Sequence, residues 1–134
     1  MAYTVIDDAS AHFQATGYTG DGGNQDITHS GNSDLQSDWI WIKNRDATDS
    51  HQLFDAVRGV TKRVLPDVTT GEETDAETLT TFGSDGFTVG DDVAVNTNTE
   101  KYVAWCWKAN GSGSANTVGD INSTVSVNTT SGLS

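Results

Sequence analysis

The chain has 134 residues, the length of one domain, and 34% of them are hydrophobic. Nineteen acidic residues against seven basic ones give a formal charge of −12, which leaves no basic stripe for binding nucleic acid. No segment has the roughly 20 apolar residues of a membrane span, and the N-terminus lacks the basic start and apolar stretch of a signal peptide.

Residues 1–14 precede the first clear turn and carry Tyr3, Ile6 and Phe13 without a sustained hydrophobic period. The sequence of this segment shows no pattern that would gather these side chains into one apolar face. We therefore expect the segment to be an N-terminal attachment arm. The glycine and asparagine residues of 18–26 then indicate tight turns, because both residue types tolerate a positive φ.

Two apolar ribbons, at 39–43 and 102–108, hold all four tryptophans, and each ribbon places its pair two residues apart. Successive side chains of an extended strand point to opposite faces, so each tryptophan pair shares one face, while Ile40 and Ile42 line the other. A strand that is apolar on both faces has to be covered on both. The ribbons therefore predict a β-sandwich with a contact surface on one side.

We expect the sandwich core to come from the part of the chain that is richest in apolar residues. The residues predicted to be largely buried are Ile40, Ile42, Phe87, Val103 and Trp105. Cys106 is the sole cysteine and lies within a ribbon, which indicates a small buried hydrophobe rather than a reactive thiol.

The chain between the ribbons alternates polar turns with short apolar runs. Residues 51–59 fit a helix and a strand almost equally well, and in an all-β context we predict a strand or an irregular edge. Residues 66–81 are acidic and rich in threonine, so we predict a long surface loop. Asp85-Gly86 within 82–90 predicts a hairpin with a type I′ turn. About seven short strands and no helix result, as in a sandwich or jelly roll.

Motifs for catalysis are missing from the sequence. None of the three histidines belongs to an HExxH motif, and the chain has neither a Gly-x-Ser-x-Gly elbow nor a phosphate-binding loop. We therefore predict no enzyme, no cofactor and no metal site. An acidic group in the 66–81 loop is interpreted as solvated rather than as a glycosidase pair: Glu72, Glu73, Asp75 and Glu77. Two groups leave calcium as an open alternative: Asp21, Asn24 and Asp26, and Asp91, Asp92 and Asn96.

The first ribbon also offers a binding surface. Trp39 or Trp41 could stack on a sugar ring, with Asn44 and Arg45 providing hydrogen bonds at the strand end. Paired tryptophans on a strand are more often part of a core or a subunit interface. The two interpretations, glycan contact and partner contact, both stay open at this point.

The last part of the chain, 109–134, is rich in Gly, Ser, Asn and Thr and poor in large side chains. We predict an arm at 1–14, a β-sandwich at 15–108, and a linker or the start of a further module at 109–134. Val125 and Val127 alternate with polar residues, so we expect an extended segment that contacts another subunit or module.

Several motifs follow one another in a defined order, at residues 2–8, 13–14, 18–20, 38–45, 51–59, 82–87 and 102–108. This order resembles that of a repeated β-rich domain in virion proteins of marine tailed bacteriophages. The resemblance implies a concanavalin-like or jelly-roll β-sandwich in a tail fibre, a head fibre or a capsid-decorating protein, with no catalytic residues.

For such a protein we expect a place in the virion after synthesis in the host cytoplasm, with other virion proteins as partners. The arm would dock on the particle through Tyr3, Ile6 and Phe13, and the sandwich would form a homo-oligomer such as a trimer. The alternative function is a glycan-binding module that recognises the host surface through an aromatic patch.

Overall fold

The two tryptophan ribbons are neighbouring antiparallel strands in the computed structural model, which describes residues 6–134. They are β3 (Trp39–Asn44) and β9 (Lys101–Trp107), and they form the centre of a four-stranded sheet. β1 (Phe13–Thr19) pairs with β9, and β4 (Gln52–Asp55) pairs with β3, so the strand order is β1-β9-β3-β4. The strand or edge predicted at 51–59 is confirmed by β4.

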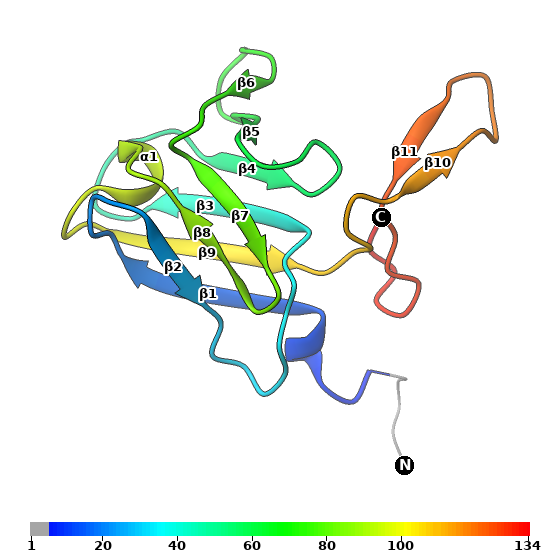
Figure 1. The fold of residues 1–134 in the computed structure, drawn as a ribbon, viewed down its shortest axis with the longest axis horizontal. Helices are drawn as coiled ribbons and strands as arrows, with labels where there is room; N and C mark the ends of the chain where they lie inside the picture. Colours follow the sequence, from blue (N-terminus) through cyan, green and yellow to red (C-terminus); the bar gives the residue numbers. More distant parts are fainter. Residues whose placement is uncertain (1–5) are drawn as a thin grey trace.

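A second sheet packs against the first. It consists of β2 (Gln25–Thr28), β8 (Gly86–Val89) and β7 (Leu79–Gly83) in the order β2-β8-β7, and all its pairings are antiparallel. Figure 1 shows this sheet crossing in front of the four-stranded sheet. The prediction of an all-β sandwich is confirmed.

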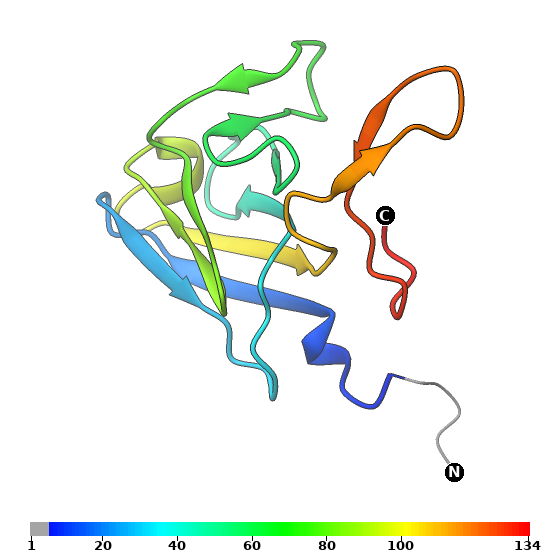
Figure 2. The ribbon, with the colours of Figure 1, turned by 45° about the vertical axis from the view of Figure 1, so that its right-hand side comes forward.

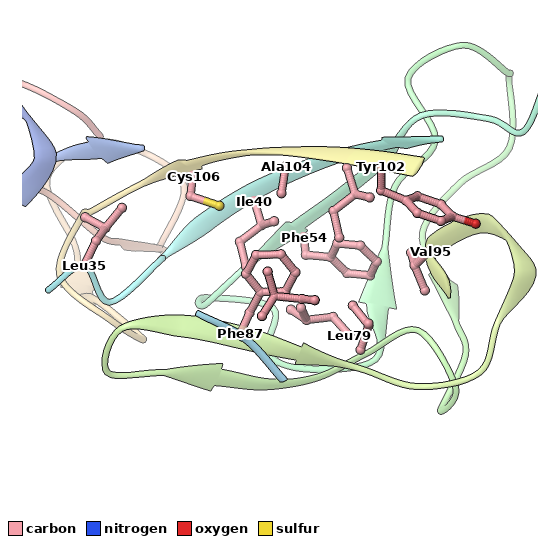
Figure 3. Close-up of a cluster of buried hydrophobic side chains, with 12 residues drawn as sticks. Leu35, Ile40, Phe54, Leu79, Phe87, Val95, Tyr102, Ala104 and Cys106 are labelled. Carbon is pink, nitrogen blue, oxygen red and sulfur yellow. The ribbon is translucent and has the colours of Figure 1, made fainter. Parts of the chain in front are cut away.

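The hydrophobic core fills the space between the two sheets, and Figure 3 shows its side chains converging there from both layers. Phe54 comes from β4 and Phe87 from β8, while β9 contributes the smaller Ala104 and Cys106. The core residues are Ile27, Leu35, Ile40, Ile42, Phe54, Leu79, Phe87, Val89, Val95, Tyr102, Ala104 and Cys106. Truncating one of the large aliphatic members to alanine would cost about 2–5 kcal/mol.

The prediction that Val103 and Trp105 are core residues is wrong. Burial alternates along β9, with the side chains of Tyr102, Ala104 and Cys106 turned into the core and those of Val103 and Trp105 turned out. A ribbon that is apolar on both faces does not reveal which face points inward. Phe87 of the facing sheet and Phe54 of β4, in the same sheet as β9, occupy the core beside the small residues Ala104 and Cys106.

Short elements connect the sheets. They are the 3₁₀ turn η1 (Ala9–Ala11), β5 (Lys62–Arg63), β6 (Glu73–Thr74) and the single helical turn α1 (Val93–Asn96). The long loop predicted at 66–81 is therefore wrong in part, because it contains β6 and the start of β7. Leu79 anchors this stretch, since its side chain is fully buried.

The hairpin predicted at 82–90 is confirmed as the β7–β8 pair, but its turn is not of type I′. Gly83 pairs with Gly86, so the central turn residues are Ser84 and Asp85, and neither has the positive φ that a type I′ turn requires. Gly86 has a φ of +126°, and a Cβ there would collide with the backbone carbonyl oxygen of Ile27. The glycine therefore permits β8 to pack closely on β2.

The C-terminal part of the chain forms a second hairpin, β10 (Ser114–Asn116) with β11 (Ser123–Val125). Figures 1 and 2 show it standing beside the sandwich, beyond the end of β9. The segment is attached to the sandwich because the backbone N–H of Ala109 donates to Asp38 Oδ2 at 2.8 Å. The proposed domain boundary at 109 stays a prediction.

Candidate functional site

Aromatic side chains from three strands gather on the face of the four-stranded sheet that turns away from the core. This outer aromatic face consists of Phe13 on β1, Trp39 and Trp41 on β3, and Trp105 and Trp107 on β9. The side chain of Phe13 is 38% exposed and the tryptophans are half-buried. The face is thus apolar and partly open to contact.

Strand register arranges these side chains in rows across the sheet. In the first row Phe13 lies opposite Trp107, Trp107 opposite Trp39, and Trp39 opposite Asp55 on β4. The ring centroids of Phe13 and Trp107 are 5.0 Å apart, and those of Trp107 and Trp39 are 4.8 Å apart in a stacked arrangement. Such cross-strand aromatic contacts stabilise a sheet and fix the rings relative to one another.

The second row contains Trp105 and Trp41, whose rings meet edge to face with centroids 5.6 Å apart. The indole N–H of Trp41 donates to Nδ1 of His51 at 2.8 Å, which assigns the unprotonated nitrogen of that imidazole. Trp41 is therefore satisfied within the fold. Its polar atom is not available to a ligand.

A groove with a volume of about 550 Å³ opens beside Trp39, between β4 and the C-terminal segment. One wall comes from the sheet and the loop after β4, and the other from β11 and the residues that follow it. The lining residues are Asp38, Trp39, Leu53, Asp55, Val57, Arg58, Ala109, Thr124, Val125, Ser126, Leu133 and Ser134. This volume lies within the range of roughly 300–1,000 Å³ that is typical of ligand pockets.

Asp55 and Arg58 provide the charged pair in the groove. Arg58 Nε donates to Asp55 Oδ2 at 2.6 Å, and the other carboxylate oxygen accepts the backbone N–H groups of Val57 and Arg58. Asp55 thereby orients the guanidinium. The pair is partly exposed, so it contributes little to folding stability.

The polar residues predicted beside the tryptophans do not join this site. Asn44 is 1% exposed, and its Oδ1 accepts the backbone N–H groups of Asp46 and Ala47. Lys43 fixes the same loop, because its ammonium donates to the backbone carbonyl groups of Asn44, Ala47 and Asp49. Asn44 is therefore a structural residue, and its prediction as a glycan contact is corrected. Arg45 is exposed, but it is not among the groove-lining residues.

The residues of the predicted arm have different placements. Tyr3 lies outside the described residues, and Ile6 is half-buried. Phe13 is the first residue of β1 and contacts Trp107, so it belongs to the sheet rather than to an arm. Whether this part of the chain docks on a particle stays a prediction.

Two of the calcium candidates, Asp92 and Asn96, make hydrogen bonds within the fold. The side-chain amide of Asn96 donates to the backbone carbonyl groups of Gly23 and Gly90, and Asp92 accepts the backbone N–H of Ala94 at the start of α1. Burial raises the pKa of the Asp92 carboxyl. Across residues 6–134, no group of three or more His, Cys, Asp or Glu side chains is placed to hold a metal ion.

The acidic loop is tied to the sandwich through Arg63. Its guanidinium lies 3.2 Å from Glu73, 3.5 Å from Asp75 and 3.6 Å from Asp92, measured from nitrogen to carboxylate oxygen. The acidic side chains at 73 and 75 therefore hold the loop after β5 in place. The prediction of a solvated acidic group is therefore corrected for Glu73 and Asp75, whereas Glu72 and Glu77 are exposed.

Residues 8–134 match the model of a protein family described as a domain of unknown function, DUF7483. The chain belongs to the DUF7483 family. The matched region of this DUF7483 domain continues through the C-terminal segment, so both walls of the groove lie within it. No curated protein and no solved structure shows a significant match to the chain. Within the described part of the DUF7483 domain, no helix is long and apolar enough to cross a membrane.

Sequence reasoning identified Trp39 but missed the residues around it. Leu53, Asp55 and Val57 alternate along the chain, which was a usable sign that their side chains share one face. Thr124 and Leu133 gave no such sign, because they lie in a segment whose composition is that of a linker. The C-terminal wall of the groove could not be found without the structure.

Proposed function

We propose that the chain is a structural bacteriophage virion protein, a fibre or capsid-decoration subunit that uses its outer aromatic face as a contact surface. The observation that carries the proposal is this face, with Phe13 38% exposed beside the stacked pair of Trp107 and Trp39. The order of sequence motifs, which resembles that of virion proteins of marine tailed phages, supports the same assignment. The proposal includes no catalytic activity, cofactor or metal.

Burial of the outer aromatic face supplies a physical reason for assembly. Removing apolar surface from water contributes about 25 cal/mol for each Å² buried, and aromatic residues are enriched in the cores of protein interfaces. The partners in this proposal are other virion proteins and further copies of the chain, in a homo-oligomer such as a trimer. The formal charge of −12 keeps the remaining surface soluble during dense display.

Two measurements test this proposal. Antibodies against the domain should label virions under the electron microscope, and the position of the gold distinguishes a fibre from a capsid decoration. Sedimentation of the purified protein at micromolar concentration should show an oligomer. A monomer in solution together with unlabelled virions would overturn the proposal.

A matched pair of variants locates the assembly surface. Phe13→Ser removes an exposed apolar side chain from the outer aromatic face, and Val93→Ser removes one from α1, where Val93 is 65% exposed. The oligomer should dissociate more readily with the first variant and be unchanged with the second. Equal effects would show that assembly does not depend on the outer aromatic face.

A second candidate function is recognition of a host-surface glycan. The observation that favours it is the groove in which Trp39 lies beside the Asp55–Arg58 pair, since sugar sites combine a flat apolar surface with a few fixed polar groups. A glycan array probed with the full chain tests this function. Absence of binding to every glycan would remove it and would leave the virion proposal standing.

A further inference from the structure

We infer that the groove between Trp39 and the C-terminal segment binds a neutral sugar unit, and this inference rests on the second proposed function, glycan recognition. It places the ligand at one end of the outer aromatic face rather than across both tryptophans of β3. It also makes the 109–134 segment part of the binding site.

Trp39 provides the apolar wall for the ring of the sugar. Trp107 stacks on one side of its indole at 4.8 Å, and the strand register places β4, with Asp55, on the other side. Trp39 lines the groove together with Leu53 of β4 and Val57, which follows β4. A flat indole surface of this kind packs against the C–H groups of a pyranose ring.

Arg58 provides fixed hydrogen-bond donors. Its Nε is held by Asp55 Oδ2 at 2.6 Å, whereas its two Nη atoms make no hydrogen bond to any residue in 6–134. Ser126 Oγ accepts the backbone N–H of Asn110 at 2.7 Å, so its hydroxyl proton is free to be donated. Both side chains line the groove, and sugar hydroxyls can accept from them.

Charge selects a neutral ligand over an acidic one. Asp38 and Asp55 line the groove against the single cation Arg58, whose charge Asp55 already balances. A uronate or sulfate group would meet this excess of carboxylate in addition to the chain's formal charge of −12. Like-charge contacts of this kind are a means of rejecting the wrong ligand.

The C-terminal segment supplies the opposite wall through Thr124, Val125 and Leu133. Its position is fixed where it leaves the sandwich, because the backbone N–H of Ala109 donates to Asp38 Oδ2 at 2.8 Å. The groove therefore exists only while this segment is folded against the sheet. A ligand held between the two walls would in turn stabilise that arrangement.

The full chain should first be probed on an array of neutral glycans and of glycans that carry uronate or sulfate groups. A neutral oligosaccharide that binds is then titrated by calorimetry into the parent protein, Trp39→Ala and Trp41→Ala. These variants form a matched pair, because both remove an indole from the same face of β3. Trp41→Ala is the control, since Trp41 is absent from the groove lining.

We expect Trp39→Ala to weaken binding at least about tenfold and Trp41→Ala to change it less than about twofold. Arg58→Met is a second probe that spares the fold, because this side chain is 37% exposed and its ion pair is worth little stability. It should weaken binding about three- to tenfold, while circular dichroism shows a native spectrum.

Several outcomes would overturn the inference. Equal losses in Trp39→Ala and Trp41→Ala would place the sugar on the open face and would leave glycan recognition intact. Unchanged affinity in both Trp39→Ala and Arg58→Met, or binding confined to uronate or sulfate glycans, would exclude a neutral sugar in the groove. No binding to any glycan would remove the second proposed function and this inference together.

Discussion

Trp39 and Trp107 face each other across β3 and β9, with ring centroids 4.8 Å apart and planes 28° from parallel. Trp107 also contacts Phe13 on β1, so a single indole joins three strands on the outside of the sheet. Trp107 therefore supports the indole of Trp39, which lines the groove. Because this contact restricts the indole before a ligand binds, less side-chain conformational entropy is lost on binding.

A double-mutant cycle measures the coupling between these two tryptophans. Trp39→Ala and Trp107→Ala, made singly and together, should give a coupling free energy of about 0.5–1.5 kcal/mol in urea unfolding, because each ring loses the stacking partner that it has in the sheet. Pairing Trp39→Ala with Val93→Ala on α1 is the control and should be additive. Additivity in the first pair would show that the stacking does not contribute to stability.

Cys106 should be inert to thiol reagents while the protein is folded. Burial raises the pKa of its thiol to about 12, although a hydrogen bond with Ser37 opposes the shift. Only the thiolate reacts, and it is almost absent near neutral pH at such a pKa. An Ellman assay should show no reaction in buffer and one thiol in concentrated urea. Rapid labelling of the native protein would contradict the buried placement.

The class of fold was predictable because the sequence encodes extended structure in two independent ways. Tryptophans two residues apart mark strands, and polar turns between apolar runs mark the changes of direction. The inward face of β9 was not predictable, because both faces of that strand are apolar. Which face of β9 points inward depends on side chains from other strands, such as Phe54 and Phe87, which share the core with Tyr102, Ala104 and Cys106.

Of the candidate site, only the tryptophans were predictable from the sequence, and the other groove-lining residues were not. Trp39 and Trp41 look equivalent in the sequence. In the structure, however, the indole N–H of Trp41 donates to His51, whereas Trp39 lines the groove. Polar residues at the end of a strand normally face solvent, so Asn44 gave no sign of its burial. The bonds of Asn44 to Glu100 and Tyr102, and the C-terminal wall of the groove, join segments far apart in sequence, and local patterns do not record such contacts.

Stability should fall as the pH drops, and His29 should be one cause. Burial lowers the pKa of its imidazole below the usual value of about 6.5, and the two ring nitrogens lie 2.7 Å from Thr16 Oγ1 and 2.8 Å from Ser37 Oγ. Below about pH 6.5 the unfolded chain therefore binds a proton that the folded state binds only at lower pH. The stabilising contribution of His29 is fully present above pH 6.5 and is lost as the pH falls toward the folded pKa.

The measurement is the free energy of unfolding in urea between pH 7.5 and pH 5, for the parent protein and His29→Gln. The glutamine keeps polar atoms at the site but does not titrate. The parent protein should lose up to about 1.4 kcal/mol per pH unit more than the variant within this window. Parallel curves would show that His29 titrates in the same way in the folded and unfolded states.

Asn44 connects the end of β3 to two carboxylates. Its Nδ2 lies 2.7 Å from Asp49 Oδ2, 2.6 Å from Glu100 Oε2 and 3.2 Å from the Tyr102 hydroxyl. The amide therefore separates two like charges and gives both a donor. Arg45, the next residue, is exposed.

Asn44→Ala and Arg45→Ala should consequently differ sharply in stability. The first substitution leaves the carboxylates of Asp49 and Glu100 without their shared donor in a part-buried setting, which should lower the free energy of unfolding by about 2–4 kcal/mol. The second removes an exposed side chain and should change it by less than about 0.5 kcal/mol. Urea unfolding of both variants at one pH provides the comparison. If Asn44→Ala were as stable as Arg45→Ala, Asn44 would not stabilise the end of β3, and a role for it in ligand contact would regain support.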